Sequence, residues 1–350
     1  MKFIHLLLFL VISFNIDAQI NTDFVVYNDQ IWSLTKDGKI DVFDYKNETK
    51  VENLISYSDT IYIITKDKNN IPIIIDNKNA IKKYDNQTKS WSKIYNYIKK
   101  PLGVLFDKEN NCYSITEKGI INLKSGKTYF SNKSLNHQIH YNDNWSRRAL
   151  TFFMDKDDNI WIGFGYGEWG GDIFIFNTKS KKFIVPELGK FEIELYPVKS
   201  FFEDENYVYL SSGLAHMSTS GCIVQFDKFH ASFFFKSESE WQKVSGDENK
   251  PKYIPAQYIG PATFNKYNNS IYFYSQDGIF KGDVKKNLSE LKDWENIIKP
   301  NLQWKVGQPD AVGSPMNVSR ITIIANDKFV IQTQNNGVGY FNGKELILIN

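Results

Sequence analysis

The amino-acid sequence predicts an all-β fold, a seven-bladed β-propeller of four-stranded antiparallel blades. A polar turn followed by a β-rich run recurs seven times, and aromatic residues make up 15% of the chain. No segment between the β-rich runs has the apolar spacing of an amphipathic helix. A supersecondary unit that recurs along a chain is the signature of a repeat fold, and aromatic residues are enriched in strands.

The first two strands of each unit form the clearest part of the repeat, best seen at residues 155–163. Polar turns rich in Asp, Asn and Lys precede each second strand, and these residue types readily adopt turn conformations. An antiparallel hairpin is therefore expected at the start of each unit. The residues that open the second strands, at spacings of 40, 41, 48, 48, 63 and 58, are Ile31, Ile71, Cys112, Ile160, Val208, Ile271 and Phe329.

A third strand usually follows a glycine, and a weaker fourth strand completes each unit. Gly171 introduces the third strand of unit 4, and residues 182–185 form its fourth strand. Residues 291–298 are compatible with either a helical turn or a fourth strand. The first and last units both look complete, so we expect the ring to close by packing of unit 1 against unit 7 rather than through a shared blade.

The run Asn159-Ile160-Trp161-Ile162-Gly163, with residues 171–176 behind it, resembles the two-component regulator propeller repeat. That family forms sensor ectodomains of bacterial hybrid sensor kinases, and related stand-alone propellers are exported by Bacteroidetes. The resemblance implies a blade and carries no catalytic residue across. Because the sequence has neither a kinase nor a membrane span, the resemblance implies a stand-alone exported propeller.

The N-terminal residues have the pattern of a secretory signal peptide. Lys2 precedes an apolar run at 6–14, and Ala18 ends a small-residue cleavage site. The run is too short to cross a bilayer, which takes about 20 apolar residues. We therefore expect a signal peptide at 1–18, a single propeller domain at 19–350, and a periplasmic or extracellular location.

Charge and cysteine content exclude some classes of function. The 42 Lys and Arg residues nearly balance the 40 Asp and Glu residues, and no basic run stands out, which disfavours nucleic-acid binding. The two cysteines, Cys112 and Cys222, fall in units that do not touch, so separate buried thiols are expected. We expect a monomer with no cofactor, no bound metal and no membrane insertion.

The long connections are all expected on one face of the ring. In a propeller, the links between second and third strands and between blades share a face. The long segments 131–146, 163–170, 211–220, 236–260 and 300–318 all belong to these two kinds. Loops on a rigid scaffold commonly carry binding residues. This face, over units 4 to 7, is therefore the expected functional surface.

The predicted ligand-binding residues combine arginines with aromatic and polar side chains. Arginine provides a planar fork for a carboxylate or phosphate, and exposed Trp and Tyr rings stack on sugars or anchor protein partners. The three arginines are the only ones in the chain. The full set is Arg147, Arg148, Arg320, Trp145, Tyr166, Glu168, Trp169, His216, Tyr258 and Asp310.

Three functions remain open from the sequence. The first is an exported non-catalytic module that binds a glycan or protein ligand. The second is a lyase or hydrolase acting on carboxylated sugars, in which His140 or His216 and Tyr166 or Tyr258 supply base and acid. The third is a structural or assembly role in the cell envelope. The glycine-rich segment 163–167 leads into a strand rather than a helix, so it is not expected to bind phosphate.

Overall fold

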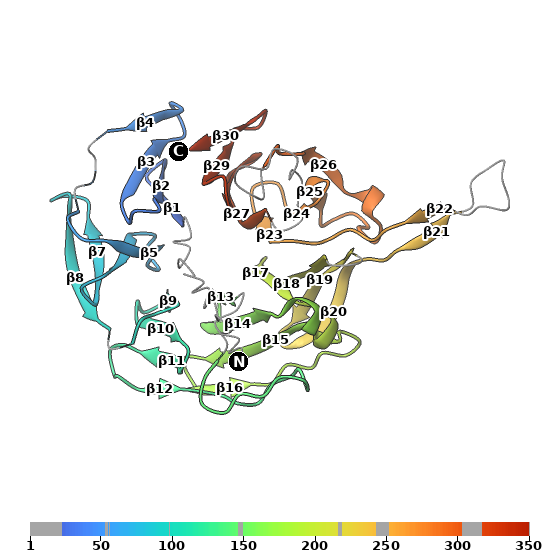
Figure 1. Ribbon diagram of the computed structural model, residues 1–350, viewed down its shortest axis with the longest axis horizontal. Coiled ribbons are helices and arrows are strands. Elements are labelled where there is room, and N and C mark those ends of the chain that lie inside the picture. Colours follow the sequence, from blue (N-terminus) through green and yellow to red (C-terminus); the bar gives the residue numbers. More distant parts are fainter. Residues whose placement is uncertain are drawn as a thin grey trace, which may run out of the picture.

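Seven four-stranded antiparallel sheets are arranged in a closed ring (Figure 1). The computed structural model describes residues 23–52, 55, 57–97, 99–145, 150–215, 219–242, 252–302 and 317–349. The predicted all-β seven-bladed propeller is confirmed. The expected signal peptide lies outside the described residues, and no described helix is long and apolar enough to cross a membrane.

The first four blades follow one another along the chain. Blade 1 contains β1 (Phe24–Tyr27), β2 (Gln30–Leu34), β3 (Ile40–Asp44) and β4 (Thr49–Val51). Blade 2 contains β5 (Ile61–Lys66), β6 (Pro72–Asp76), β7 (Ala80–Asp85) and β8 (Ser90–Asn96). Blade 3 contains β9 (Gly103–Phe106), β10 (Cys112–Thr116), β11 (Gly119–Asn122) and β12 (Thr128–Tyr129). Blade 4 contains β13 (Leu150–Met154), β14 (Asn159–Gly165), β15 (Gly171–Asn177) and β16 (Lys182–Ile184).

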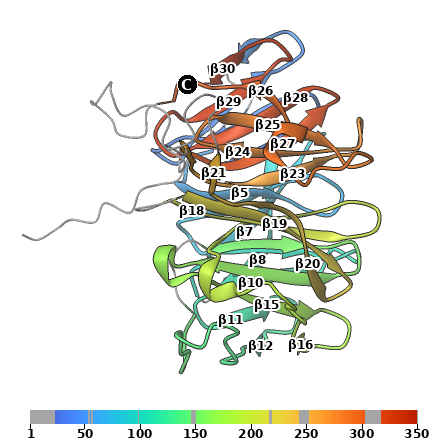
Figure 2. The ribbon, with the colours of Figure 1, turned by 90° about the vertical axis from the view of Figure 1, so that its right-hand side faces the viewer.

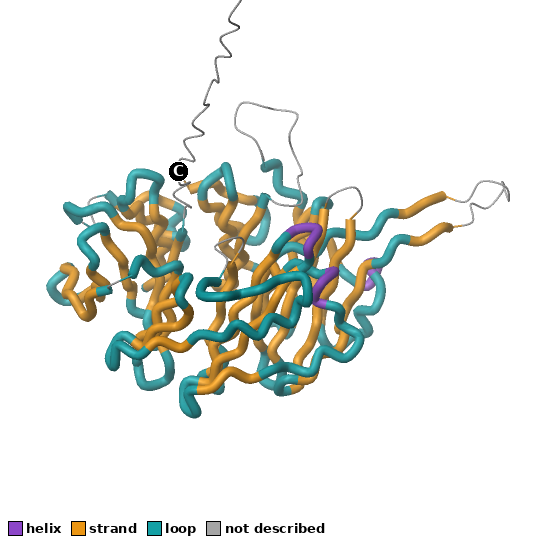
Figure 3. The backbone as a smooth tube through the Cα atoms, turned by 60° about the horizontal axis from the view of Figure 1, so that its bottom comes forward, coloured by secondary structure: helices purple, strands orange, loops and turns teal. Residues whose placement is uncertain are grey.

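The last three blades repeat this order with two additions. Blade 5 contains β17 (Val198–Glu203), β18 (Val208–Ala215), β19 (Thr219–Asp227) and β20 (His230–Ser237). Blade 6 contains β23 (Ala262–Asn265), β24 (Ser270–Ser275), β25 (Gly278–Asp283) and β26 (Glu295–Ile298). Blade 7 contains β27 (Val318–Ala325), β28 (Lys328–Thr333), β29 (Val338–Phe341) and β30 (Leu346–Ile349). The additions are the hairpin β21 (Glu240–Gln242) and β22 (Lys252–Ile254), which projects from the ring (Figures 1 and 3), and the short 3₁₀ helix η3 (Leu291–Asp293).

The first strand of every blade lies nearest the centre of the ring and the fourth lies at its edge (Figure 1). Edge-on, the strands run between the two faces of the disc (Figure 2). The links between second and third strands, and those between blades, therefore share a face, as the strand order predicted. Residues 291–298 form both alternatives that the sequence left open, a 3₁₀ turn followed by β26.

The ring closes through side-chain packing between two complete blades, which confirms the expectation. Blades 1 and 7 are separate sheets, and none of the described strands is shared between them. Their contact is a buried cluster that includes Phe24 and Ile31 from blade 1 and Val330 and Tyr340 from blade 7. At its edge, Asn342 Nδ2 of blade 7 donates to Glu48 Oε1 of blade 1 at 3.1 Å.

The polar turns of the repeat are held by a buried aspartate. Asp155 Oδ1 accepts hydrogen bonds from the backbone N–H groups of Asp157 and Asn159, both at 2.8 Å. Its Oδ2 accepts from the Asn159 amide and from Trp161 Nε1, again at 2.8 Å. Asp67 and Asp107 hold the corresponding turns of blades 2 and 3 in the same way. The Asp therefore fixes the turn that starts the second strand.

These turns also connect neighbouring blades. The backbone N–H of Lys68 donates to Asn110 Oδ1 of the next blade at 3.0 Å. Lys108 N then donates to Asp158 Oδ1 at 2.9 Å, linking blade 3 to blade 4. Repetition of the same turn thus provides repeated contacts between blades on the face with short links.

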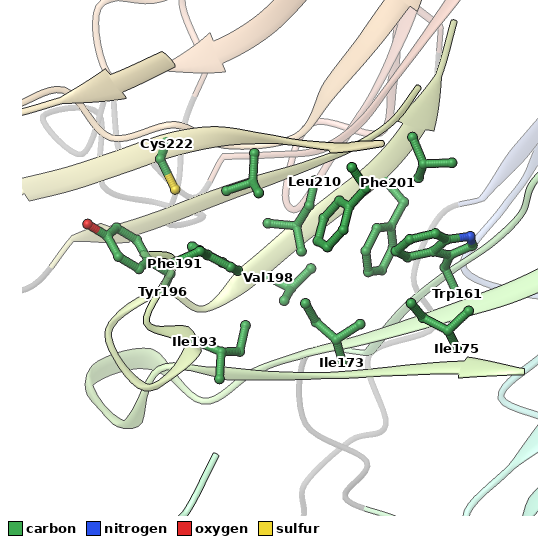
Figure 4. Close-up of a cluster of buried hydrophobic side chains, with 13 residues drawn as sticks. Trp161, Ile173, Ile175, Phe191, Ile193, Tyr196, Val198, Phe201, Leu210 and Cys222 are labelled. Carbon is green, nitrogen blue, oxygen red and sulfur yellow. The ribbon is translucent and has the colours of Figure 1, made fainter. Parts of the chain in front are cut away.

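Several long connections fill the spaces between blades. Between blades 4 and 5, Phe191, Ile193 and Tyr196 of the connection 185–197 are buried against strands of both sheets (Figure 4). The segment 131–145 packs between blades 3 and 4 in the same manner. Part of each of these two connections therefore belongs to the core.

The two cysteines are separate, buried and unpaired, as expected. Cys112 lies in β10 and Cys222 in β19, two strands of different blades. Burial raises the pKa of both thiols well above the usual value, so they behave as small apolar core residues.

Candidate functional site

Three connections meet at the end of blade 4 on the face with long links. They are the segment 131–145, the 3₁₀ helix η1 (Gly167–Trp169) between β14 and β15, and the 3₁₀ helix η2 (Ile193–Leu195) before blade 5. A cavity of about 340 Å³ opens beside them. We call it the blade-4 pocket; it is lined by Ile139, His140, Tyr141, Asn144, Trp145, Tyr166 and Trp169.

Stacked aromatic rings build the inner wall of the blade-4 pocket. The Tyr166 ring lies parallel to Phe164, with centroids 5.9 Å apart and an interplanar angle of 5°. Its hydroxyl is hydrogen-bonded to the hydroxyl of Tyr141. Trp145 is fixed at both ends, since its backbone N–H donates to Glu117 O at 2.7 Å and its Nε1 donates to Ser131 O at 3.0 Å.

The rim of the pocket carries an exposed indole. Trp169 is 63% exposed, and Leu195 on the adjoining turn is 55% exposed. The two turns are in direct contact, because a Cβ on Gly170 would lie only 2.1 Å from the carbonyl oxygen of Glu194. Large apolar side chains with this much exposure are commonly found where a ligand or partner binds.

A buried polar cluster attaches the segment 131–145 to blade 4. Asp172 and Asn136 are both fully buried. Asp172 Oδ1 accepts from Leu135 N at 2.9 Å, and its Oδ2 lies 2.5 Å from Ser134 Oγ. The Asn136 amide donates to Trp169 O at 2.8 Å and to Gly171 O at 3.0 Å. This cluster therefore positions both walls of the blade-4 pocket.

Burial dominates the electrostatics of the site. Desolvation raises the pKa of Asp172 above its ordinary value, although hydrogen bonds from Ser134 and from backbone N–H groups oppose the change. Desolvation also raises the pKa of Tyr141 and of Tyr166, and it is the largest cause for both phenols. Both phenols are consequently protonated at neutral pH and act as hydrogen-bonding groups.

Comparison with known proteins supports the fold and nothing finer. Neither a family model nor a curated protein sequence matches the chain. Solved structures of similar fold include U3-55K and the WD40 repeats of RRP9, each at 9% identity and a TM-score of 0.52. They align over 89% of this chain and over 91% and 90% of their own. At this identity the likeness shows a shared propeller, a scaffold that hosts many unrelated functions.

Four of the predicted site residues are brought together in blade 4. Trp145, Tyr166 and Trp169 line the blade-4 pocket, and exposed Glu168 lies on the same 3₁₀ turn as Trp169. Trp145 differs from the expectation of an exposed stacking platform, because it is only 2% exposed. Its ring packs against Phe174, with centroids 5.1 Å apart, and it serves as the floor of the pocket.

Two other predicted residues lie elsewhere. Arg320 of β27 forms an ion pair with Asp23 Oδ1 at 2.8 Å and donates to Phe24 O at 2.6 Å, which places it at the contact between blades 7 and 1. Tyr258 is 2% exposed, and its backbone N–H donates to Gln276 Oε1. The Arg320 side chain is held by contacts within the protein, the Tyr258 side chain is buried, and neither lines the blade-4 pocket.

The remaining predicted residues, Arg147, Arg148, His216 and Asp310, lie outside the described residues. Their contribution to binding stays a prediction. Among the described residues, no group of three or more His, Cys, Asp and Glu side chains is arranged to hold a metal ion. His140 and Tyr166 do share the blade-4 pocket, so one of the two histidine–tyrosine combinations considered for an enzyme is close in space.

Sequence reasoning missed several residues that build the site. Tyr141 and Asn144 line the blade-4 pocket, and Asp172 with Asn136 holds its walls. One signal was present: Asp172 stands between Gly171 and the apolar run Ile173-Phe174, where a charge is unexpected in a buried strand. Such a residue needs hydrogen-bonding partners, and here they come from the preceding connection.

Proposed function

We propose that this protein is a non-catalytic binding module that holds a glycan in the blade-4 pocket. The observation that supports this proposal is the combination of an exposed Trp169 with a pocket whose other walls are Tyr141, Trp145 and Tyr166. Aromatic faces stack on the apolar faces of sugar rings, and a rigid ring of blades pre-organises them.

Polar groups in the pocket suit a sugar as well. His140 and Asn144 line the pocket, and the Tyr166 hydroxyl is directed to Tyr141 at its inner wall. These groups can donate and accept hydrogen bonds with sugar hydroxyls. The volume of about 340 Å³ lies at the lower end of the range for small-ligand sites, which is about 300–1,000 Å³. A short glycan segment, rather than a long chain, would fill it.

Substitution of Trp169 tests the proposal. A glycan array identifies a bound oligosaccharide, and calorimetry then compares wild type with Trp169→Ala. Loss of the stacking face should weaken binding at least about tenfold, which corresponds to about 1.4 kcal/mol. Leu195→Ser, on the adjoining turn and outside the pocket lining, is the matched control. Unchanged affinity in Trp169→Ala would count against the blade-4 pocket, and equal losses in both variants would mean that the oligosaccharide binds over both turns rather than in the pocket.

An enzyme acting on carboxylated sugars is the second candidate, because His140 and Tyr166 share the blade-4 pocket. In a β-elimination these side chains would serve as base and acid. The test is release of unsaturated product from uronate polysaccharides. Turnover that is abolished by His140→Ala would replace the binding-only proposal.

We further propose that the chain is exported and that its kinship lies with the stand-alone propellers it resembles. The support is the sequence pattern of residues 1–18 and the repeat at 159–163. Mass spectrometry of protein recovered from the periplasm and the culture medium should find Gln19 at the N-terminus. Recovery of uncleaved protein from the cytoplasm alone would contradict export.

A further inference from the structure

We propose that Asp172 is held as a neutral carboxylic acid and that, in this form, it fastens the segment 131–145 to blade 4, so that the order of the blade-4 pocket depends on pH. The inference concerns regulation of the pocket, and it rests on the proposed function only for its consequence on ligand binding. Its basis is the number of hydrogen atoms available around Ser134.

The Ser134 hydroxyl has three close partners and a single hydrogen. Asn136 N donates to Ser134 Oγ at 3.1 Å. The carbonyl oxygen of Asn136, which can only accept, lies 2.7 Å from Ser134 Oγ. Asp172 Oδ2 lies 2.5 Å from the same Oγ. A hydroxyl donates once and accepts twice.

Only one protonation state of Asp172 satisfies all three contacts. If Asp172 were a carboxylate, its Oδ2 and the Asn136 carbonyl would compete for the one hydrogen of Ser134. If Asp172 carries a proton on Oδ2, it donates to Ser134 Oγ, and Ser134 donates to the Asn136 carbonyl. The other carboxyl oxygen, Oδ1, acts as the carbonyl oxygen of the neutral acid, because it only accepts hydrogen bonds. Its donors are Leu135 N and Ile173 N, each at 2.9 Å.

The surroundings of Asp172 favour the neutral form. The side chain is fully buried, and the described groups that act on its carboxyl are Ser134, two backbone N–H groups and the Tyr141 hydroxyl, none of which is a cation. An unpaired charge in such a place is costly, so an acid at this position tends to keep its proton. Burial accordingly raises the pKa of Asp172.

Because the pKa of Asp172 is raised in the folded chain, the direction in which stability changes with pH can be stated. The folded chain holds the Asp172 proton more tightly than an unfolded chain, whose carboxyl has the ordinary value of 3.8. The stability contributed by the neutral acid is therefore largest in acid and declines as the pH rises from about 3.8 through the folded pKa of Asp172. Above that value, a buried charge weakens the attachment of Ser134 and Leu135.

The consequence reaches the blade-4 pocket because the attached segment supplies most of its lining. Five lining residues follow Asn136 in the same connection: Ile139, His140, Tyr141, Asn144 and Trp145. Among the described residues, the titratable groups facing Asp172 are the phenol of Tyr141, which is hydrogen-bonded to it, and the phenol of Tyr166. His137, His140, Glu168 and Glu194 stand on the adjoining turns, so His137→Gln and His140→Gln variants are needed to separate imidazole titration from that of Asp172.

The decisive experiment measures the titration of Asp172 in the full chain by carbon NMR of its side-chain carboxyl, assigned with Asp172→Asn. Ser134→Ala removes the acceptor of the acid proton. The pKa of Asp172 should therefore fall in this variant relative to wild type. A rise would overturn the proposal, because it would mean that Ser134 donates to a carboxylate.

A second measurement keeps the proposal testable if Ser134→Ala does not fold. Amide hydrogen exchange of residues 131–145 is followed from about pH 4 to about pH 9 after correction for intrinsic rates. Protection should decline with rising pH in wild type and in both histidine variants, and it should stay level in Asp172→Asn, whose amide can still donate to Ser134. A decline that persists unchanged in Asp172→Asn would overturn the proposal. Neither measurement uses a ligand, so the result is independent of whether the pocket binds a glycan.

Discussion

Individual buried polar side chains determine how the blade-4 pocket is built. Asn136 illustrates this, since every polar atom of its amide has a partner: Nδ2 donates to Trp169 O and Gly171 O, and Oδ1 accepts from Gln138 N at 3.0 Å. A buried amide with complete hydrogen bonding fixes one local geometry, because any shift leaves a donor or acceptor unpaired. The exposed Trp169 is therefore positioned by a buried side chain that does not line the pocket.

Replacement of Asn136 should reveal that support. Asn136→Ala leaves the carbonyls of Trp169 and Gly171 without their donor, and we expect the free energy of unfolding to fall by about 2–4 kcal/mol. The measurement is urea unfolding followed by tryptophan fluorescence. Asn132→Ala, at an exposed position of the same connection, is the control and should change stability by less than about 0.5 kcal/mol. Equal losses of stability in the two variants would contradict a specific role of the Asn136 amide.

For single residues, the sequence predicted which kinds of side chain lie at the site better than it predicted which of them are exposed to solvent. Trp169 and Tyr166 lie where binding residues were expected, but Trp145 and Tyr258 are core. A tryptophan in a long connection can face solvent or fill the space between blades, and composition does not distinguish the two. Arg320 shows the same ambiguity, since a rare arginine is equally suited to a ligand carboxylate and to Asp23.

At the element scale, connections between blades act as extra layers of core. Blade 3 has a short outer strand, β12, of two residues, and the segment 131–145 packs between blades 3 and 4. The 3₁₀ helices η1 and η2 are then pressed together at Gly170, which has φ 70° and ψ −141°. Glycine is required there both for this backbone conformation and for the approach of Glu194.

Two alanine substitutions separate these two requirements. Gly167 also has a positive φ of 66°, but a Cβ there would meet no atom within 4 Å. Gly167→Ala should therefore cost only the conformational strain, about 1 kcal/mol. Gly170→Ala adds a collision with the Glu194 backbone and should cost at least about 2 kcal/mol more. Chemical denaturation measures the free energy of unfolding of both variants. Similar losses of stability would show that η1 and η2 can move apart at little cost.

The second strands of all seven blades could be predicted because the repeat encodes them locally. The Asp turn hydrogen-bonds to its own backbone, as at Asp155, so its signal needs no distant partner. The connection 185–197 was not recognised as a segment that packs against the turn η1 beside the pocket. Its apolar residues Phe191 and Ile193 are buried because they pack between blades 4 and 5. No local sequence pattern identifies this contact, so the burial of these two residues could not be predicted.

At the scale of the whole molecule, the ring depends on one contact that differs from the others. Between consecutive blades the chain itself provides a connection, whereas blades 7 and 1 meet through side chains. Arg320 is central to this contact: besides its bonds to Asp23 and Phe24, its guanidinium carbon lies 4.0 Å from the centroid of the Phe24 ring. Hydrogen bonding of a charged group and a cation–π contact together stabilise the closed form.

Removal of Arg320 should therefore weaken closure. Arg320→Ala is expected to lower the free energy of unfolding by about 1–2 kcal/mol and to increase amide exchange in β1 and β27 more than in blade 4. The control is Lys50→Ala, which removes a solvent-exposed ion pair to Asp41 at 3.4 Å and should cost less than about 0.5 kcal/mol. Exchange that rises uniformly around the ring would contradict a specific role in closure.

The contact between blades 1 and 7 also determines how the molecule would respond to mechanical force. Stretching the chain between Asp23 and Ile349 loads a boundary at which the described residues form packed side-chain contacts but no strand pairing. The boundary would part first and leave each four-stranded sheet whole, after which blades would be extracted one at a time from the two ends. Blade 4, halfway along the chain, would be among the last to be disrupted, and its pocket would persist in a ring that had already opened.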